Sequence, residues 1–147
     1  MIEMINLQRC VKVPEGRIRA AIRHVMMEEL GSEVNVSVAV VDDGRIAELN
    51  RVFLKRIGPT DVLAFPLDEG LGTEEPERVV GEIVISAERA RREARKRHTT
   101  TDTELILYAV HGMLHLAGHD DRTPGERKRM RRREAEVLAS LGLARRS

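Results

Sequence analysis

Residues 111–121 read His-Gly-Met-Leu-His-Leu-Ala-Gly-His-Asp-Asp and hold three of the five histidines of the chain. The residues just before them, 105–110, are continuously apolar, which predicts a buried helix that runs into this stretch. Thr101, followed three residues later by Glu104, predicts a capping box at the start of that helix. Gly118 predicts its end, because a left-handed C-terminal cap favours glycine.

His111 and His115 are four residues apart, so on a helix both imidazole rings project from one face. The roots of the two side chains then lie about 6 Å apart, and two ring nitrogens can bind one cation. A zinc site that keeps one position open for water has three protein ligands. The spacing therefore predicts a zinc site that needs one further donor.

The third ligand is sought in the three residues after Gly118. Asp121 is the first residue well placed to swing back toward the two histidines, because Gly118 lets the chain reverse. His119 is the alternative ligand, and it would be the nearest donor if the helix continued. Asp120 is the remaining candidate, either sharing the role of ligand or acting from outside the coordination sphere. We predict that His111, His115 and Asp121 bind the metal, with His119 as the alternative to Asp121.

Three segments of the chain resemble the YbeY family of bacterial endoribonucleases. They are Pro-Thr-Asp-Val-Leu-Ala-Phe-Pro at 59–66, Gly-Glu-Ile-Val-Ile-Ser at 81–86, and His-Gly-x-Leu-His-Leu-x-Gly at 111–118 followed by aspartate. Their order and spacing, and the total length, fit over nearly the whole chain. The resemblance implies a single-strand-specific, metal-dependent ribonuclease that acts in 3′-end maturation of small-subunit ribosomal RNA and in ribosome quality control. It also implies the small ribosomal subunit or its assembly factors as partners.

The chain departs from the family pattern near the predicted site. The family usually has histidine where this chain has Asp121, and tyrosine where it has His119. An arginine that often follows the Leu-Asn-x-x-aromatic segment falls here on Leu54, with Lys55 and Arg56 next. A carboxylate is an accepted zinc ligand, so the first change alters the ligand set without abolishing the site. The change at Leu54 leaves the phosphate-contacting residue open.

The composition limits the class of protein. A chain of 147 residues is the usual size of one domain, and we expect a single domain over 1–147. Cys10 is the only cysteine, which excludes an intrachain disulfide and a zinc site built from cysteines. No apolar run is long enough to cross a membrane, so we expect a cytoplasmic protein.

Local patterns predict an α+β fold. Strands are expected at 1–7, 34–40, 60–65 and 79–85, with 60–65 at an edge and 79–85 in the centre of the sheet. Helices are expected after Pro14, Asp43, Ser86, Thr101 and Thr123, and an acidic loop at 67–78. The helix capped by Asp43 is expected to carry Ile46, Leu49 and Phe53 on one face. We predict a small mixed β-sheet covered by helices, with a zincin-like metal site at the end of a buried central helix.

Arginine and lysine are dense in two runs, 89–97 and 127–133, on either side of the predicted metal helix. Basic side chains gain affinity for nucleic acid by releasing counterions from its backbone. We predict that Arg92 of the first run, together with Lys55 and Arg56 next to the position of the family's arginine, contacts the phosphates of single-stranded RNA. Aromatic residues are only 2% of the chain, so contact is expected with the backbone and with little sequence preference.

The predicted ligands favour a hydrolase. Zinc on these three residues would lower the pKa of a bound water or polarise a phosphoryl oxygen, which fits phosphodiester hydrolysis. Zinc proteases place a glutamate directly after the first histidine, and here that residue is Gly112. If a separate general base is needed, Glu82 and Asp120 are candidates. The principal hypothesis is therefore a zinc-dependent endoribonuclease, with His111, His115 and Asp121 at its catalytic centre.

A second hypothesis is a non-catalytic, zinc-containing module that binds RNA or the ribosome. Structural zinc sites normally have four protein ligands. If His119 joined the other three side chains, the coordination shell would close and catalysis would fail. The number of protein ligands therefore discriminates the two hypotheses.

Overall fold

The computed structural model describes residues 1–67 and 79–143, so most of the predicted acidic loop at 67–78 lies outside the described residues. The elements in chain order are β1 (Ile2–Asn6), α1 (Glu15–Leu30), β2 (Asn35–Val41), α2 (Asp43–Leu54), β3 (Val62–Pro66), β4 (Val79–Ser86), α3 (Ala87–Arg97), α4 (Thr101–Leu116) and α5 (Pro124–Ser140). In the described part of the chain, no helix combines the length and the apolar character that crossing a membrane requires.

The sheet is mixed, as predicted. Its strand order is β1-β2-β4-β3. The first three strands run parallel, and β3 pairs antiparallel with β4 at the edge. The alternation of valines in β2 turns Val36, Val38 and Val40 into the interior, where each is at most 1% exposed. The predicted α+β fold, with β3 at the edge and β4 inside the sheet, is confirmed.

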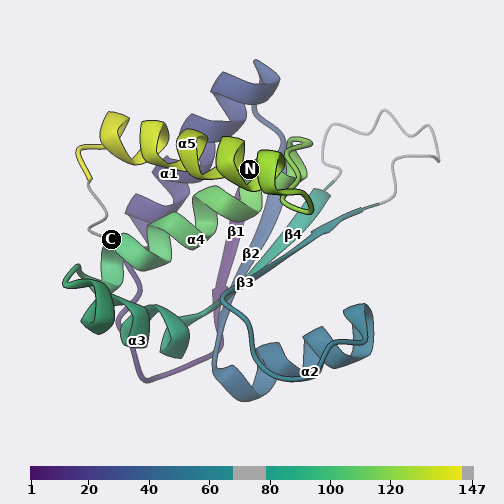
Figure 1. The fold of residues 1–147 in the computed structure, drawn as a ribbon, viewed down its shortest axis with the longest axis vertical. Coiled ribbons are helices and arrows are strands. Elements are labelled where there is room, and N and C mark those ends of the chain that lie inside the picture. Colours follow the sequence, from purple (N-terminus) through teal and green to yellow (C-terminus); the bar gives the residue numbers. More distant parts are fainter. Residues whose placement is uncertain (68–78, 144–147) are drawn as a thin grey trace.

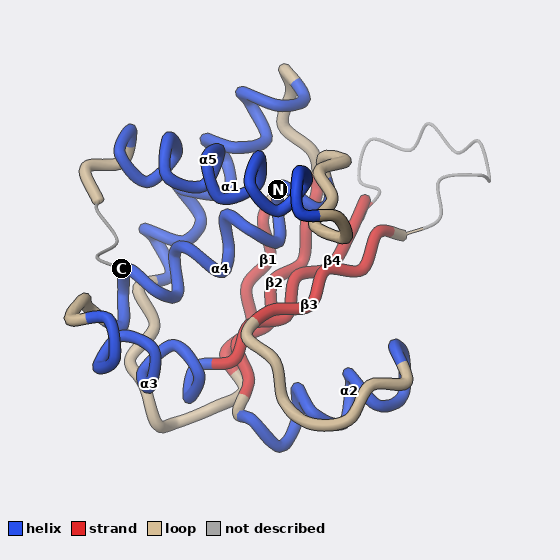
Figure 2. Tube along the Cα trace, in the orientation of Figure 1, coloured by secondary structure: helices blue, strands red, loops and turns tan. Residues whose placement is uncertain are grey.

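Helices cover both faces of the sheet unequally. Figures 1 and 2 show α1, α3, α4 and α5 on one side and α2 alone on the other. The larger core lies on the four-helix side and includes Ile83 and Ile85 of β4, whereas Val84 belongs to a smaller cluster with Ile46 of α2. Ile46, Leu49 and Phe53, which were predicted to share one face of α2, differ in exposure. Ile46 is buried and Leu49 packs against the smaller cluster, whereas the Phe53 side chain is 63% exposed and its ring packs edgewise on Phe65 of β3.

The helix α4 is buried over most of its length. All residues from Thr103 to Val110 are buried, and so are 112–114. A helix that is apolar all round needs partners on every side, and α4 contacts α1, α3, α5, β3 and β4. Apart from its first two residues, its exposure rises only toward the C-terminal end, at His111 and from His115 onward. The apolar run therefore anchors the helix, and the two histidines lie where it emerges from the core.

Two helices begin one residue away from the predicted position. Thr100, not Thr101, caps α4 and accepts a hydrogen bond from the Thr103 backbone nitrogen, while Glu104 is buried and forms no capping box. Likewise Asp42, not Asp43, caps α2. An N-cap residue has an extended backbone, and only the folded chain decides which of two identical neighbours adopts it. The predicted caps at Ser86 and Thr123 are confirmed.

The turn after α4 is a Schellman motif. The helix ends at Leu116, and Gly118 adopts the left-handed conformation with φ of 106°. The Gly118 nitrogen donates to the His115 carbonyl, and the His119 nitrogen donates to the Leu114 carbonyl, both at 3.0 Å. The chain therefore reverses directly after the helix, as the sequence predicted for Gly118, and residues 119–121 return toward its last turn.

Close packing of α4 on β4 makes a prediction for Gly112. A Cβ at this position would lie 2.7 Å from Cγ2 of Ile83, so Ile83 would have to move. We expect Gly112→Ala to lower the free energy of unfolding by about 1–3 kcal/mol, the usual effect of overpacking a core. Urea denaturation measures this. Gly16→Ala in α1 is the control, because nothing lies within 4 Å of its added Cβ. Equal stability of the two variants would contradict this packing.

Candidate metal centre

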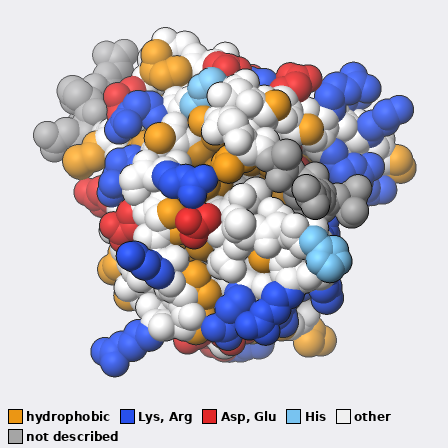
Figure 3. All heavy atoms as spheres, turned by 90° about the vertical axis from the view of Figure 1, so that its left-hand side faces the viewer, with side chains coloured by type: hydrophobic (Ala, Val, Ile, Leu, Met, Phe, Trp, Pro, Cys, Tyr) orange, Lys and Arg blue, Asp and Glu red, His pale blue; other side chains and the backbone are white. Residues whose placement is uncertain are grey.

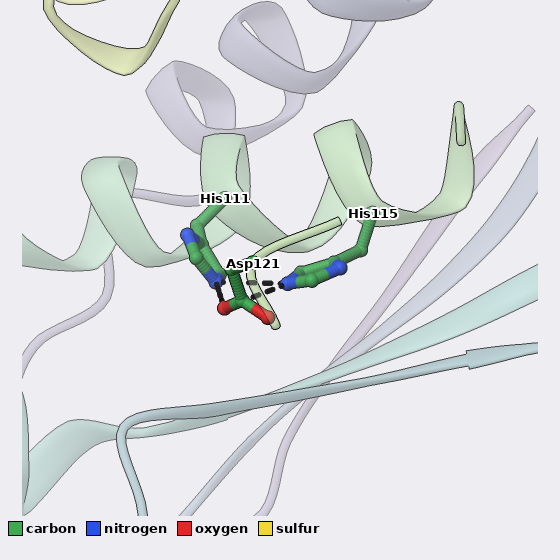
Figure 4. Close-up of side chains that lie close together, drawn as sticks. All are labelled: His111, His115 and Asp121. Carbon is green, nitrogen blue, oxygen red and sulfur yellow. Dashed lines mark hydrogen bonds and ion pairs between the residues drawn. The ribbon is translucent and has the colours of Figure 1, made fainter. Parts of the chain in front are cut away.

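The side chains of His111, His115 and Asp121 meet at the C-terminal end of α4 (Figure 4). The Nε2 atoms of the two histidines are 3.1 Å apart. The Asp121 Oδ2 atom lies 3.5 Å from Nε2 of His111 and 3.3 Å from Nε2 of His115. Helical spacing places the two rings side by side, and the turn at Gly118 brings the carboxylate back to them.

The three donor atoms have the spacing of a metal site. Ligands about 2.0–2.1 Å from a tetrahedral zinc ion are separated from one another by about 3.3 Å. The three observed separations lie close to that value, and two imidazoles with one carboxylate are accepted zinc donors. In the part of the chain that the structure describes, this is the one group of three such side chains that could hold a metal ion.

His119, the alternative third ligand, does not join this group. Its Nε2 atom lies 2.6 Å from Oε1 of Glu29 in α1. The same Glu29 oxygen accepts a hydrogen bond from Nε of Arg133 in α5, at 3.3 Å. Asp120 accepts a hydrogen bond from the backbone nitrogen of Asp121. The structure therefore brings Asp121 to the two histidines and directs His119 toward α1.

Glu134 is a site residue that the sequence analysis missed. It is buried in α5, and its Oε2 atom lies 2.5 Å from Nδ1 of His111. A hydrogen bond at Nδ1 leaves Nε2 as the nitrogen that faces the other two donors. The sequence signal was weak, because Glu134 is one acidic residue at the end of a run of arginines and lies 23 residues from its partner.

The pKa of His111 reflects two opposing effects. Burial lowers it, but the hydrogen bond that His111 donates to Glu134 and the charges of Glu134, Asp61 and Asp121 raise it, and the net pKa is raised. A histidine ligand must be neutral to bind a metal. A proton therefore competes with a metal ion for His111 up to a higher pH than it would for an ordinary histidine.

A hollow of about 620 Å³ opens over the three side chains. Its lining includes Asp61 and Asp120, and the basic residues Arg56 and Arg122. Asp61 both lines the hollow and binds the backbone at the start of β3. The Asp61 Oδ1 atom accepts a hydrogen bond from the Val62 backbone nitrogen, at 2.8 Å.

Two predicted substrate contacts are placed elsewhere among the described residues. Lys55 ends α2 in a left-handed conformation and does not line the hollow. Arg92 does not line it either, because its guanidinium donates to Asp43 at 2.6 Å. Glu82, a candidate base, is exposed on β4 and is also absent from the lining. Of the predicted phosphate contacts, Arg56 is the one that the fold brings to the site.

The α+β fold, with a His-His-Asp cluster at the end of a buried helix, is that of a protein with a candidate metal site. Comparisons with known proteins identify its family. The family model described as Endoribonuclease YbeY matches residues 3–142. The chain belongs to this family.

Curated relatives support the assignment. Endoribonuclease YbeY of Pelotomaculum thermopropionicum is 42% identical over 146 residues, covering 95% of this chain and 96% of that protein. The protein of the same name from Carboxydothermus hydrogenoformans is 37% identical and covers 99% and 100%. The solution structure of TM1509 from Thermotoga maritima is similar with a TM-score of 0.61 and 28% identity, covering 96% of this chain and 91% of that one.

Metal binding should depend on the clustered histidines. We expect His115→Ala to weaken zinc binding by at least about 100-fold, because it leaves two donors of three. Isothermal titration with zinc measures the affinity. His24→Ala, which removes a histidine of α1 that pairs with Glu28, should bind zinc like the unaltered protein. Equal loss in both variants would contradict the assignment of the cluster.

Glu134 should strengthen zinc binding through its hydrogen bond with His111. We expect Glu134→Gln to weaken zinc binding about tenfold, because the carboxylate that orients the ring and raises its basicity is lost. Glu136→Gln, an exposed position of the same helix that pairs with Arg133, is the matched control. A Glu134→Gln variant that folds normally and binds zinc with unchanged affinity would refute this role.

Proposed function

We propose that this chain is a zinc-dependent endoribonuclease that hydrolyses phosphodiester bonds of single-stranded RNA. The observation that carries the proposal is the His111-His115-Asp121 cluster at the base of an open hollow. Membership of the Endoribonuclease YbeY family agrees with it. The alternative, a zinc protease, is disfavoured. Zinc proteases have a glutamate directly after the first histidine, and in this chain the residue after His111 is Gly112.

Three protein donors suit catalysis better than a structural role. Structural zinc sites normally have four protein ligands, and His119, the nearest further histidine, is engaged by Glu29. A bound divalent metal supplies Lewis-acid chemistry, which eases proton loss from water and polarises a phosphoryl oxygen. Three protein donors would leave a coordination position for water on a bound zinc ion, which favours the enzyme over a non-catalytic RNA- or ribosome-binding module.

The chain's own residues provide the remaining requirements of hydrolysis. In the reaction the oxygen of water bonds to phosphorus, the bond from phosphorus to the leaving ribose oxygen breaks, and that oxygen gains a proton. Asp120 and Asp61 line the hollow and are the carboxylates that we propose as acceptors of the proton that water releases. Glu82 is not retained as a candidate, because it is exposed outside the lining.

Arg56 and Arg122 are the proposed contacts to substrate phosphate. Both line the hollow with the clustered donors, and a guanidinium offers several donors to phosphate oxygens. They replace the arginine that the family pattern would place at Leu54. A second, smaller hollow borders His111 and Asp121 on the α5 side, where Arg127 and Arg131 line it. Basic side chains also gather in several groups on the face drawn in Figure 3, which suits a polyanionic substrate.

The natural substrate that we propose is small-subunit ribosomal RNA, at the stage of 3′-end maturation and quality control in the cytoplasm. This part of the proposal rests on the family resemblance. Contact with the small ribosomal subunit or its assembly factors would then deliver the single-stranded segment to the hollow.

Cleavage of RNA tests the activity. We expect zinc-loaded protein to cleave a labelled single-stranded RNA, and His115→Ala to be at least about 100-fold slower, since the metal and its chemistry are lost. Denaturing gel electrophoresis measures the rates, with His24→Ala as the purification-matched control. Equal cleavage by all three proteins would indicate a contaminating nuclease. No cleavage by any of them, with zinc bound, would favour the binding module.

A further inference from the structure

The hollow over the metal centre is lined by two chemically different groups of side chains. One group is the clustered donors together with Asp61 and Asp120. The other group, the apolar side, comes from the end of α2, the following loop and β3, a segment that also contributes Arg56 and Thr60; its members are Leu54, Ile57, Pro59, Val62, Leu63, Ala64 and Pro66. A nucleotide has the same division, because its phosphate is anionic and the faces of its base are apolar.

Large apolar side chains are unusually exposed on the apolar side. Ile57 is fully exposed, and Leu54 is 43% exposed. Phe53 extends the exposed surface next to them and packs edgewise on Phe65, with ring centroids 5.6 Å apart. Scattered exposed apolar residues need no explanation, but several grouped at a hollow mark a binding surface.

The backbone holds Ile57 in this exposed position. Lys55 ends α2 in the left-handed conformation, with φ of 54°, so the chain turns away from the helix axis. The buried Asn50 side chain donates from Nδ2 to the Gly58 carbonyl at 3.0 Å, and the Arg56 backbone nitrogen donates to the Asn50 carbonyl. Ile57 is therefore on a loop tied at both sides to one buried residue, and its exposure is built into the fold.

We propose that Leu54 and Ile57 form a platform for one unpaired base of the RNA substrate. The base packs on the two side chains while the adjoining phosphate faces Arg56 and the metal centre. The inference rests on the proposed function and specifies how its substrate is recognised. Continuity with the metal centre favours RNA over a protein partner, because whatever fills the hollow also contacts His111, His115 and Asp121. A volume of about 620 Å³ is within the usual range for small-molecule sites.

Single-strand preference follows from this arrangement. In a duplex both faces of a base are covered by its neighbours, whereas an unpaired base can be turned out and packed on a protein surface. Aliphatic contacts to a base face do not read its hydrogen-bonding edge, so little base preference is expected. The scarcity of aromatic residues predicted contact with the RNA backbone, and the exposed platform adds a base contact that uses aliphatic side chains in place of aromatic ones.

The affinity of a platform variant for single-stranded RNA tests the proposal. The probe is a short fluorescein-labelled single-stranded RNA, and fluorescence anisotropy in the presence of a chelator measures affinity without cleavage. We expect the Leu54→Ala, Ile57→Ala double variant to bind this RNA about 5- to 10-fold more weakly, and to bind the duplex form unchanged. A Met27→Ala, Leu30→Ala variant is the control, because these α1 side chains are also exposed large apolar residues, at 47% and 41%, but do not line the hollow.

Probes with one abasic position, moved along the strand, separate a base contact from a general loss. For the unaltered protein, one position should weaken binding to about the same extent as the double variant does. For the double variant, that abasic position should cause no further loss. Unchanged affinity of the double variant, or losses that simply add, would overturn the platform. Cleavage by zinc-loaded protein is scored separately, so the platform can fail while the nuclease activity stands, and the reverse.

Discussion

The close contact between α4 and β4 is the constraint on which the site depends. At Gly112 the helix lies against Ile83, and at Gly81 the strand lies against Leu116, where an added Cβ would be 2.5 Å from the Leu116 side chain. Glycine on each element removes the Cβ that would hold the two apart. The helix is thereby set close to the sheet, and the face carrying the metal-centre histidines turns toward the hollow.

Two carboxylates orient two of the histidines near the end of α4 in different directions. Glu134 of α5 binds Nδ1 of His111, which leaves its Nε2 for the cluster. Glu29 of α1 binds Nε2 of His119, and Arg133 binds the same carboxylate. The loop that carries Asp121 is thus held between two helices that are distant in sequence. Buried or half-buried carboxylates with a hydrogen-bonded partner are favourable where an unpaired one would be costly.

The hollow joins this polar cluster to an apolar surface, and that combination links the fold to its proposed chemistry. The clustered donors come from α4 and the turn after it, whereas Leu54 and Ile57 come from α2 and its following loop. Strand β3 contributes to the apolar side, and it is the strand in direct contact with α4 at the sheet edge.

The sequence by itself determined the elements and the nearest contacts. The apolar run 105–110, the four-residue spacing of His111 and His115, and the glycine of the turn are local features, and local backbone geometry makes their consequences readable. Only the tertiary structure decided the rest. It selected Asp121 over His119, brought Glu134 to His111, and paired Arg92 with Asp43, because each outcome depends on which distant helix packs beside the side chain. No periodicity in the chain records such long-range partners.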